Sequence, residues 1–147
     1  MKNLSPVERF SALAVRRGMT LGALYSASAG DFALVLAAAA AAFKPDRTYT
    51  EREVNDILRD WLAHAGAMLE VDHVELRRWL IDNRLLDRDG FGRAYTRGSP
   101  SPKAASLAAA LEEVDLAEVA RDARARDAAA REQRKMQWEQ RKGSTDE

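Results

Sequence analysis

Two helix-start signatures in the middle of the sequence constrain the fold of this chain more than any other feature. Thr50-Glu51-Arg52-Glu53 is a capping box, in which the Thr50 hydroxyl accepts from the Glu53 amide while the Glu53 side chain reaches back to Thr50. Asp72-His73-Val74-Glu75 repeats the pattern with an aspartate cap. These signatures predict two consecutive helices, the second running from His73 to about Asn83.

The first of these helices has one clearly apolar side. At about 100° per residue, its large apolar residues fall on a single stripe, and Gly66 provides a stop signal. The stripe contains Val54, Ile57, Leu58, Trp61, Leu62 and Ala65. We therefore expect one face in the core and the other in solvent.

A glycine-punctuated turn follows the second helix. Gly90-Phe91-Gly92 separates Leu85–Asp89 from Arg93–Arg97, and both flanking runs fit short strands. The pattern predicts a β-hairpin.

The N-terminal part of the chain carries its own helix signals. Ser5-Pro6-Val7-Glu8 predicts a helix from Pro6 to Arg17 that ends at Gly18, and 20–30 is expected to be a loop. A second helix is predicted over Asp31–Phe43, with Asp31 as its cap, because this run is apolar and contains six consecutive alanines.

Downstream of the hairpin, Gly98-Ser99-Pro100-Ser101-Pro102 indicates a linker. A helical rhythm then continues for about three turns, and the charged, alanine-rich stretch 121–142 is either an exposed helix or a disordered tail. We therefore expect an N-terminal helical extension over 1–30, a central domain over 31–98, and a linker with a helical or partly disordered tail over 99–147.

The order of the central elements, with closely spaced helices followed by a hairpin, is that of a winged helix. The expected fold class is mainly α with a small β-hairpin. Four segments also form a recognisable set of motifs: Tyr49–Leu58, Leu76–Asp82, Leu85–Gly90 and Tyr95–Arg97. Together they resemble the bacterial domain of unknown function 2087 family over roughly 31–98. The hairpin departs from the family pattern at Phe91, Gly92 and Thr96.

The family resemblance implies a modest functional expectation. Its members occur alone or fused to helix-turn-helix regulators, and no activity is established for the domain itself. The resemblance therefore points toward regulation and says nothing about 1–30 or the tail.

Several classes of function find no support in the sequence. There is no cysteine, and His64 and His73 are nine residues apart, which does not suit a metal site on one helical face. Nucleophile, phosphate-loop and dinucleotide motifs are absent, so we expect no catalysis and no cofactor. The 12-residue apolar run from Phe32 to Phe43 is shorter than the roughly 20 residues that a membrane span needs. A cytoplasmic protein without membrane contact is expected.

Nucleic-acid binding is the first of two functional hypotheses. The 23 basic and 23 acidic residues leave no net charge, so any attraction for DNA is local. The segment from His73 to Arg97 contains six arginines and four carboxylates, which is a slight excess of positive charge. The candidate DNA contacts are His73, Arg78, Arg88, Arg93 and Arg97.

Two other arginines of this region project from the apolar arc of the second helix. Arg77 and Arg84 are therefore expected to form internal ion pairs with carboxylates such as Glu53 or Asp87.

The second hypothesis is a winged-helix-shaped module that binds another protein or a second copy of itself. Its candidate interface residues are Trp79, Leu107, Leu111 and Val114. The alternative for the last three is a helix that folds back on the domain.

Overall fold

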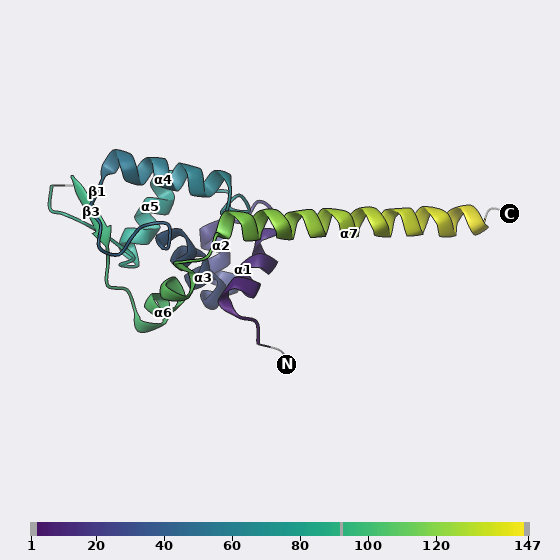
Figure 1. Ribbon diagram of the computed structural model, residues 1–147, viewed down its shortest axis with the longest axis horizontal. Coiled ribbons are helices and arrows are strands. Elements are labelled where there is room, and N and C mark those ends of the chain that lie inside the picture. The colour runs from purple at the N-terminus through teal and green to yellow at the C-terminus, as the bar shows by residue number, and fades with distance from the viewer. Residues whose placement is uncertain (1–2, 92, 146–147) are drawn as a thin grey trace.

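The computed structural model describes residues 3–91 and 93–145 of the chain. Over these residues the chain is mostly helical, with three short strands (Figure 1). In chain order the elements are α1 (Pro6–Ala14), α2 (Leu21–Ala27), α3 (Ala29–Ala40), β1 (Tyr49–Thr50), α4 (Glu51–Ala63), α5 (His73–Asp82), β2 (Leu86–Arg88), β3 (Ala94–Arg97), α6 (Pro102–Leu111) and α7 (Leu116–Thr145).

The predicted helix starts are confirmed. Ser5 and Glu8 form a reciprocal capping box on α1, and Thr50 and Glu53 do the same on α4. The Asp72 side chain accepts from the Glu75 amide at the start of α5. Each cap satisfies backbone amides that have no partner within the helix.

The prediction of a loop over 20–30 is wrong. This stretch contains α2, which is capped by Thr20 and buries Leu21 and Leu24 against the core. The cap of α3 is Ser28, not Asp31, which lies in the first turn and forms an ion pair of 2.6 Å with Arg9. Small residues weaken the helical pattern of the sequence here, and burial of two leucines makes up for it.

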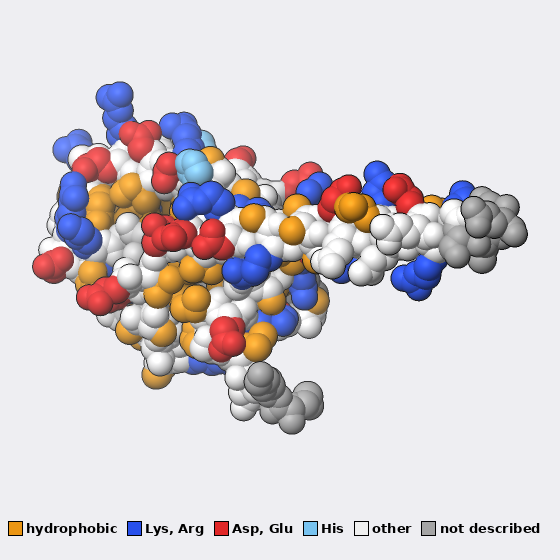
Figure 2. All heavy atoms as spheres, turned by 45° about the vertical axis from the view of Figure 1, so that its right-hand side comes forward, with side chains coloured by type: hydrophobic (Ala, Val, Ile, Leu, Met, Phe, Trp, Pro, Cys, Tyr) orange, Lys and Arg blue, Asp and Glu red, His pale blue; other side chains and the backbone are white. Residues whose placement is uncertain are grey.

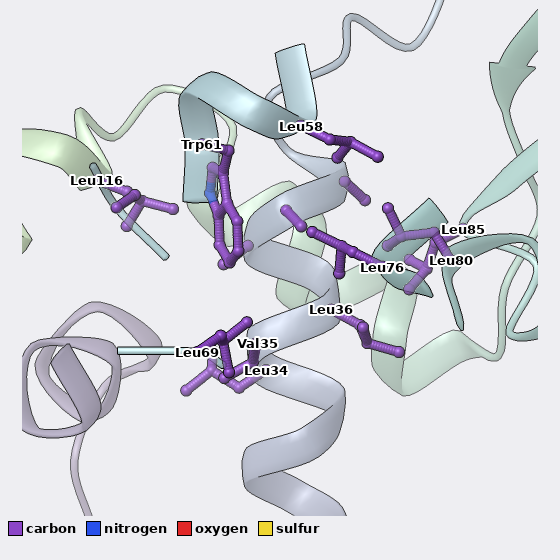
Figure 3. Packing of buried hydrophobic residues seen from close by; sticks show 14 of the residues in the cluster. Leu34, Val35, Leu36, Leu58, Trp61, Leu69, Leu76, Leu80, Leu85 and Leu116 are labelled. Atoms are coloured by element: carbon purple, nitrogen blue, oxygen red, sulfur yellow. The ribbon is translucent and has the colours of Figure 1, made fainter. Parts of the chain in front are cut away.

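Helix α3 lies at the centre of the molecule, and other helices surround it (Figure 3). Leu34, Leu36 and the alanines 37–40 are almost completely buried. Because alanine side chains are short, α6 packs along α3 at close range. The alanine-rich apolar run of the sequence is therefore the central helix of the hydrophobic core.

Strand β1, which the sequence pattern did not reveal, completes a three-stranded antiparallel sheet of order β1-β3-β2. Tyr49 pairs with Tyr95, and Leu86 pairs with Arg97, which confirms the predicted hairpin. Gly92 of the predicted turn lies outside the described residues. The order α3-β1-α4-α5-β2-β3 confirms a mainly helical α+β fold with the element order of a winged helix.

A single hydrophobic core takes residues from all three of the expected segments. Phe10 and Leu13 of α1, Leu111 of α6 and Ala120 of α7 belong to the same buried cluster as Leu80 of α5. The N-terminal extension and the beginning of the tail therefore pack onto the central domain.

The expected helical rhythm after the linker is divided between two helices, and Asp115 caps the second by accepting from the Glu118 amide. Helix α7 begins against the body, where Leu116, Ala120 and Ala123 are buried, and its side chains are exposed from Ala128 to Gly143. This second half extends away from the body as a charged arm (Figures 1 and 2). Of the two alternatives for the tail, the exposed helix is the one found.

Arg124 fastens α7 to the body. Its guanidinium donates to the carbonyl oxygen of Ala14 at 3.0 Å and to that of His64 at 2.9 Å, at the C-terminal ends of α1 and α4. A cation at these ends is favourable because helix C-termini carry partial negative charge. Within the described residues, no helix is both long and apolar enough to span a bilayer.

Candidate nucleic-acid interface

Helix α5 is held at both ends by local structure. Asp72 caps its start, and its end is a Schellman motif in which the Leu85 amide donates to Leu80 and the Arg84 amide donates to Ile81. Arg84 occupies the left-handed position of this motif with φ of 61°, where glycine is the usual residue. Leu76 and Leu80 are buried, so the opposite face is the one that a partner can reach.

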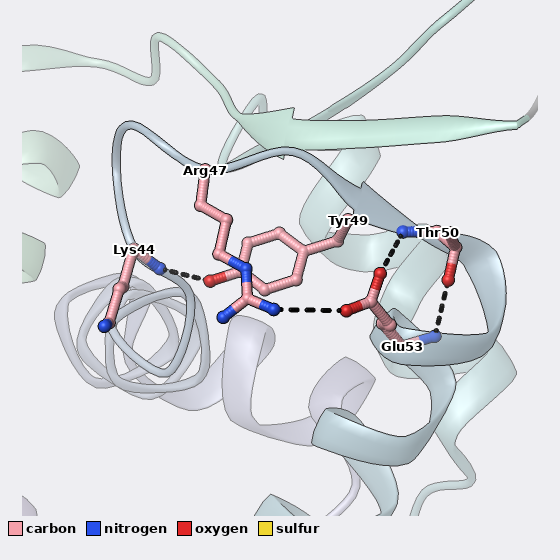
Figure 4. Close-up of polar contacts among 5 residues, drawn as sticks. All are labelled: Lys44, Arg47, Tyr49, Thr50 and Glu53. Carbon is pink, nitrogen blue, oxygen red and sulfur yellow. Dashed lines mark hydrogen bonds and ion pairs between the residues drawn. The ribbon is translucent and has the colours of Figure 1, made fainter.

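The residues around β1 connect the sheet to the helices (Figure 4). The Tyr49 hydroxyl accepts from the Lys44 amide at 2.8 Å, and the Arg47 guanidinium lies 5.0 Å from the centre of the Tyr49 ring. Arg47 also donates to Glu53 at 3.3 Å. The hydrogen bonds from Thr50, followed by the charge of Arg47, hold the pKa of the Glu53 carboxyl below its ordinary value.

Arg77 forms an internal ion pair, but its partner differs from those predicted. Its guanidinium lies 3.3 Å from the Glu51 carboxylate and donates to the Asn55 side-chain oxygen at 2.6 Å. Neither Glu53 nor Asp87 contacts it, because Glu53 is turned toward its own cap. Arg77 thus joins α5 to α4 and is largely withdrawn from the surface.

Arg84 does not form the predicted ion pair. Its side chain is exposed, and no carboxylate partner for it occurs in the described residues. The left-handed turn at Arg84 takes this residue out of the helical periodicity from which the prediction was made. Asp87 likewise shows no ion pair in the part of the chain that the structure describes.

Arg97 was predicted to contact DNA, and this prediction is wrong. Its side chain is only 12% exposed, pairs with Glu112 at 3.2 Å, and donates to the Phe43 carbonyl oxygen at 2.9 Å. Arg97 therefore ties the end of β3 to the end of α6 and to the segment that follows α3, and it is not available for phosphate.

The other predicted basic contacts lie at the surface. Arg78 on α5 and Arg88 and Arg93 on the hairpin are exposed, and none has an ion-pair partner among the described residues. His73 is half-buried, and its Nε2 atom lies 3.3 Å from the Arg59 guanidinium. Arg88 and Arg93 thus lie on the hairpin of β2 and β3, which we call the wing, and Arg78 lies on the neighbouring helix α5.

The tip of the hairpin carries a residue that the sequence reasoning did not select. Phe91 is 84% exposed, more than any other large apolar side chain described. The Asp89 carboxylate accepts from the amides of Phe91 and Arg93 and so shapes the turn. A large aromatic residue beside glycines in a predicted turn has no core to enter, which is the signal that identifies it.

The outward face of α5 and the hairpin is balanced in charge. With Arg77 and Arg97 turned inward, Arg78, Arg84, Arg88 and Arg93 remain exposed beside Glu75, Asp82, Asp87 and Asp89. The slight positive excess expected from the sequence is therefore lost from this surface.

The residues predicted as a protein interface are mostly used inside the molecule. The Trp79 ring packs edge-on against Phe32 with ring centres 5.2 Å apart. Leu111 is 1% exposed, and Leu107 and Val114 pack against the same core. For Leu111 the prediction of a partner contact is wrong, because α6 folds back along α3 and buries this side chain. Leu107 and Val114 are only partly buried, and a partner contact there stays a prediction.

No group of three or more histidine, aspartate or glutamate side chains that could hold a metal ion occurs in the described ranges 3–91 and 93–145.

The comparisons with known proteins identify a family over the central part of the chain. Residues 25–97 match the family model described as "Uncharacterized protein conserved in bacteria (DUF2087)". The matched family is the one that the sequence motifs resemble, and the matched residues include every element from α3 to β3. The comparisons with curated proteins and with solved structures found no match.

Proposed function

Because residues 25–97 belong to this bacterial DUF2087 family and have the element order of a winged helix, we propose that the chain is a small regulatory protein that binds duplex DNA through its wing. The proposed role is recognition, with no chemical step.

The exposed side chains of the wing are the observation on which this proposal rests. Phe91 projects from the turn between β2 and β3, with the exposed Arg88 and Arg93 on the two sides of the turn. Arginines without carboxylate partners are available for phosphate oxygens, and an apolar side chain beside them suits a DNA groove. Burial of Phe91 on binding would also remove an exposed aromatic ring from water.

Helix α5 has a supporting role in this proposal. Glu75 and Asp82 lie on its outward side with Arg78, and phosphates repel carboxylates, so deep insertion of this helix into the major groove is disfavoured. Arg78 provides a phosphate contact at the edge of the helix. Arg77 and Arg97 hold α5 and the hairpin in position.

A second candidate is a protein-interaction module. The balanced charge of the α5 face, together with the 41% exposed Val74, fits a polar protein partner better than a polyanion. This candidate uses the same face without the wing arginines as essential contacts.

Binding of labelled mixed-sequence duplex DNA over a salt series separates the two candidates. We expect Arg88→Ala/Arg93→Ala to lower the slope of log K against log salt by about 2, since each lost phosphate contact removes about 0.9. Arg121→Ala/Arg126→Ala removes the same charge from exposed positions on α7 and is the matched control. If the unaltered protein does not bind duplex DNA at low salt, the DNA proposal is wrong and the protein-interaction candidate replaces it.

A further inference from the structure

The exposed half of α7 has a basic face that is separate from the winged helix. The sequence repeats Glu-Gln-Arg-Lys at 132–135 and 139–142. Seven residues are almost two helical turns, so the arginines and lysines of the two copies lie on the same side of the helix.

Helical geometry places an aromatic ring within this basic face. Between 124 and 142, a sector of about 120° contains six basic side chains, Trp138 and a single carboxylate, Asp127. Asp127 is already paired with Arg131 at 3.0 Å. We call this sector the α7 stripe, and its members are Arg124, Asp127, Arg131, Arg134, Lys135, Trp138, Arg141 and Lys142.

Glu132 and Glu139 lie outside the stripe by helical periodicity, although Glu132 also lines the groove at its beginning. Trp138 is 59% exposed, and it lies in the half of α7 whose described side chains are exposed. The ammonium group of Lys142 lies 5.1 Å from the centre of the Trp138 ring.

The stripe begins in a groove where α7 leaves the body. This groove has a volume of about 630 Å³, and it is lined by Arg16 and Arg17, which follow α1, together with Arg124. Asp127 and Glu132 line it as well, so its basic side chains outnumber its carboxylates without excluding them. Arg124 has no carboxylate partner in the described structure, and its Nη2 atom is buried without a hydrogen bond. Burial without a counter-charge lowers the pKa of the Arg124 guanidinium, so an anion nearby is electrostatically favoured.

We propose that the α7 stripe and this groove bind single-stranded nucleic acid, with the basic side chains along the phosphates and Trp138 stacked on a base. Charge and an exposed aromatic ring together are the two elements of a single-strand site. The bases of a duplex are already stacked on one another, whereas the bases of an unpaired strand are free to stack on the indole ring.

An anionic membrane is a poorer match for the same charges. A helix that lies on a membrane has a continuous apolar face, whereas Met136 and Trp138 are on different sides of α7. The stripe extends for about 27 Å from Arg124 to Lys142, a length suited to several nucleotides. The α7 arm and the hairpin lie at opposite ends of the molecule, so this site is independent of the wing (Figure 1).

The test measures binding of a labelled oligothymidylate to the full chain by fluorescence anisotropy over a salt series. We expect Arg134→Gln/Lys135→Gln/Arg141→Gln to lower the salt slope by about 2, since each single-strand phosphate contact contributes about 0.7. We expect Trp138→Ala to weaken binding about tenfold with an unchanged slope. Gln133→Ala/Gln137→Ala/Gln140→Ala alters three exposed residues outside the stripe, and binding should not change.

Three results would overturn the proposal: unchanged binding by the triple charge variant, equal affinity for duplex and single strand with no effect of Trp138→Ala, or binding to phosphatidylserine vesicles without binding to the oligonucleotide. The Arg88→Ala/Arg93→Ala variant should retain binding to the single strand. Failure of the wing proposal and failure of this one are therefore seen with different probes and different variants.

Discussion

Replacement of Gly98 by alanine tests how the base of the wing is built. Gly98 follows β3, and its amide donates to the Leu85 carbonyl at 3.0 Å. A Cβ atom at this position would lie 2.2 Å from the carbonyl oxygen of Arg84 and 2.9 Å from its carbonyl carbon. These are backbone atoms, so no side-chain rotation relieves the contact, and the junction of α5 and β2 has to move.

The expected cost follows from that geometry. Overpacking in a well-packed site costs about 1–3 kcal/mol, and a contact about 1 Å too short against backbone belongs at the upper end of that range. We therefore expect Gly98→Ala to lower the free energy of unfolding by about 3 kcal/mol. Urea-induced unfolding followed by far-ultraviolet circular dichroism measures this loss as a lower midpoint with an unchanged m-value.

Gly22→Ala is the matched control. Gly22 lies in α2 with no atom near its potential Cβ position, so alanine should raise the free energy of unfolding by about 0.5–1 kcal/mol through helix propensity. A Gly98→Ala variant within about 0.5 kcal/mol of the unaltered protein would refute the close approach of the two backbones, on the usual scale for surface changes.

The remaining predictions concern the end of α5, the Arg9–Asp31 ion pair, the attachment of α7 by Arg124, and Phe91 at the wing tip. Arg84→Gly should raise the free energy of unfolding by about 1 kcal/mol because glycine adopts a positive φ freely, and an unchanged urea midpoint would contradict this. The Arg9 guanidinium lowers the pKa of the Asp31 carboxyl, so the stability that this pair contributes is present above the ordinary carboxyl pKa and is lost as the pH falls below it. Asp31→Asn should therefore make the thermal midpoint less sensitive to acid. Equal acid sensitivity of the variant and the unaltered protein would argue against the pair. Arg124→Ala should cost about 2 kcal/mol by leaving two helix-end carbonyl groups without their donor, and hydrogen exchange at the start of α7 should rise with it. Phe91→Ala should leave the urea midpoint unchanged, since the ring is 84% exposed, while duplex DNA binding weakens; a loss of stability would show that the ring is packed.

The features that were predicted correctly from the sequence are local ones. A capping box joins residues three positions apart, and an amphipathic stripe repeats every few residues, so Ser5, Thr50 and Asp72 could be assigned as helix starts without knowledge of the fold. Glycines marked the hairpin for the same reason. The family motifs lie within these elements, and the match over residues 25–97 confirms them.

The errors arose where a distant segment decides the outcome. Leu21 and Leu24 form a helix because the core covers them, although their neighbours give a weak pattern. Strand β1 exists because Tyr49 pairs with Tyr95. Leu111 faces α3 and not a partner because of how α6 folds back, which no periodicity reports.

The sequence by itself determined most of the helical segments, where several of them begin, and which residues of the central domain form the apolar faces. Only the tertiary structure decided which arginines remain at the surface, because the ion-pair partners of Arg77 and Arg97, Glu51 and Glu112, lie on other segments of the chain. An ion pair depends on the distance between two groups after folding. Local pattern fixes the direction of a side chain on its own helix, but it does not specify what lies opposite.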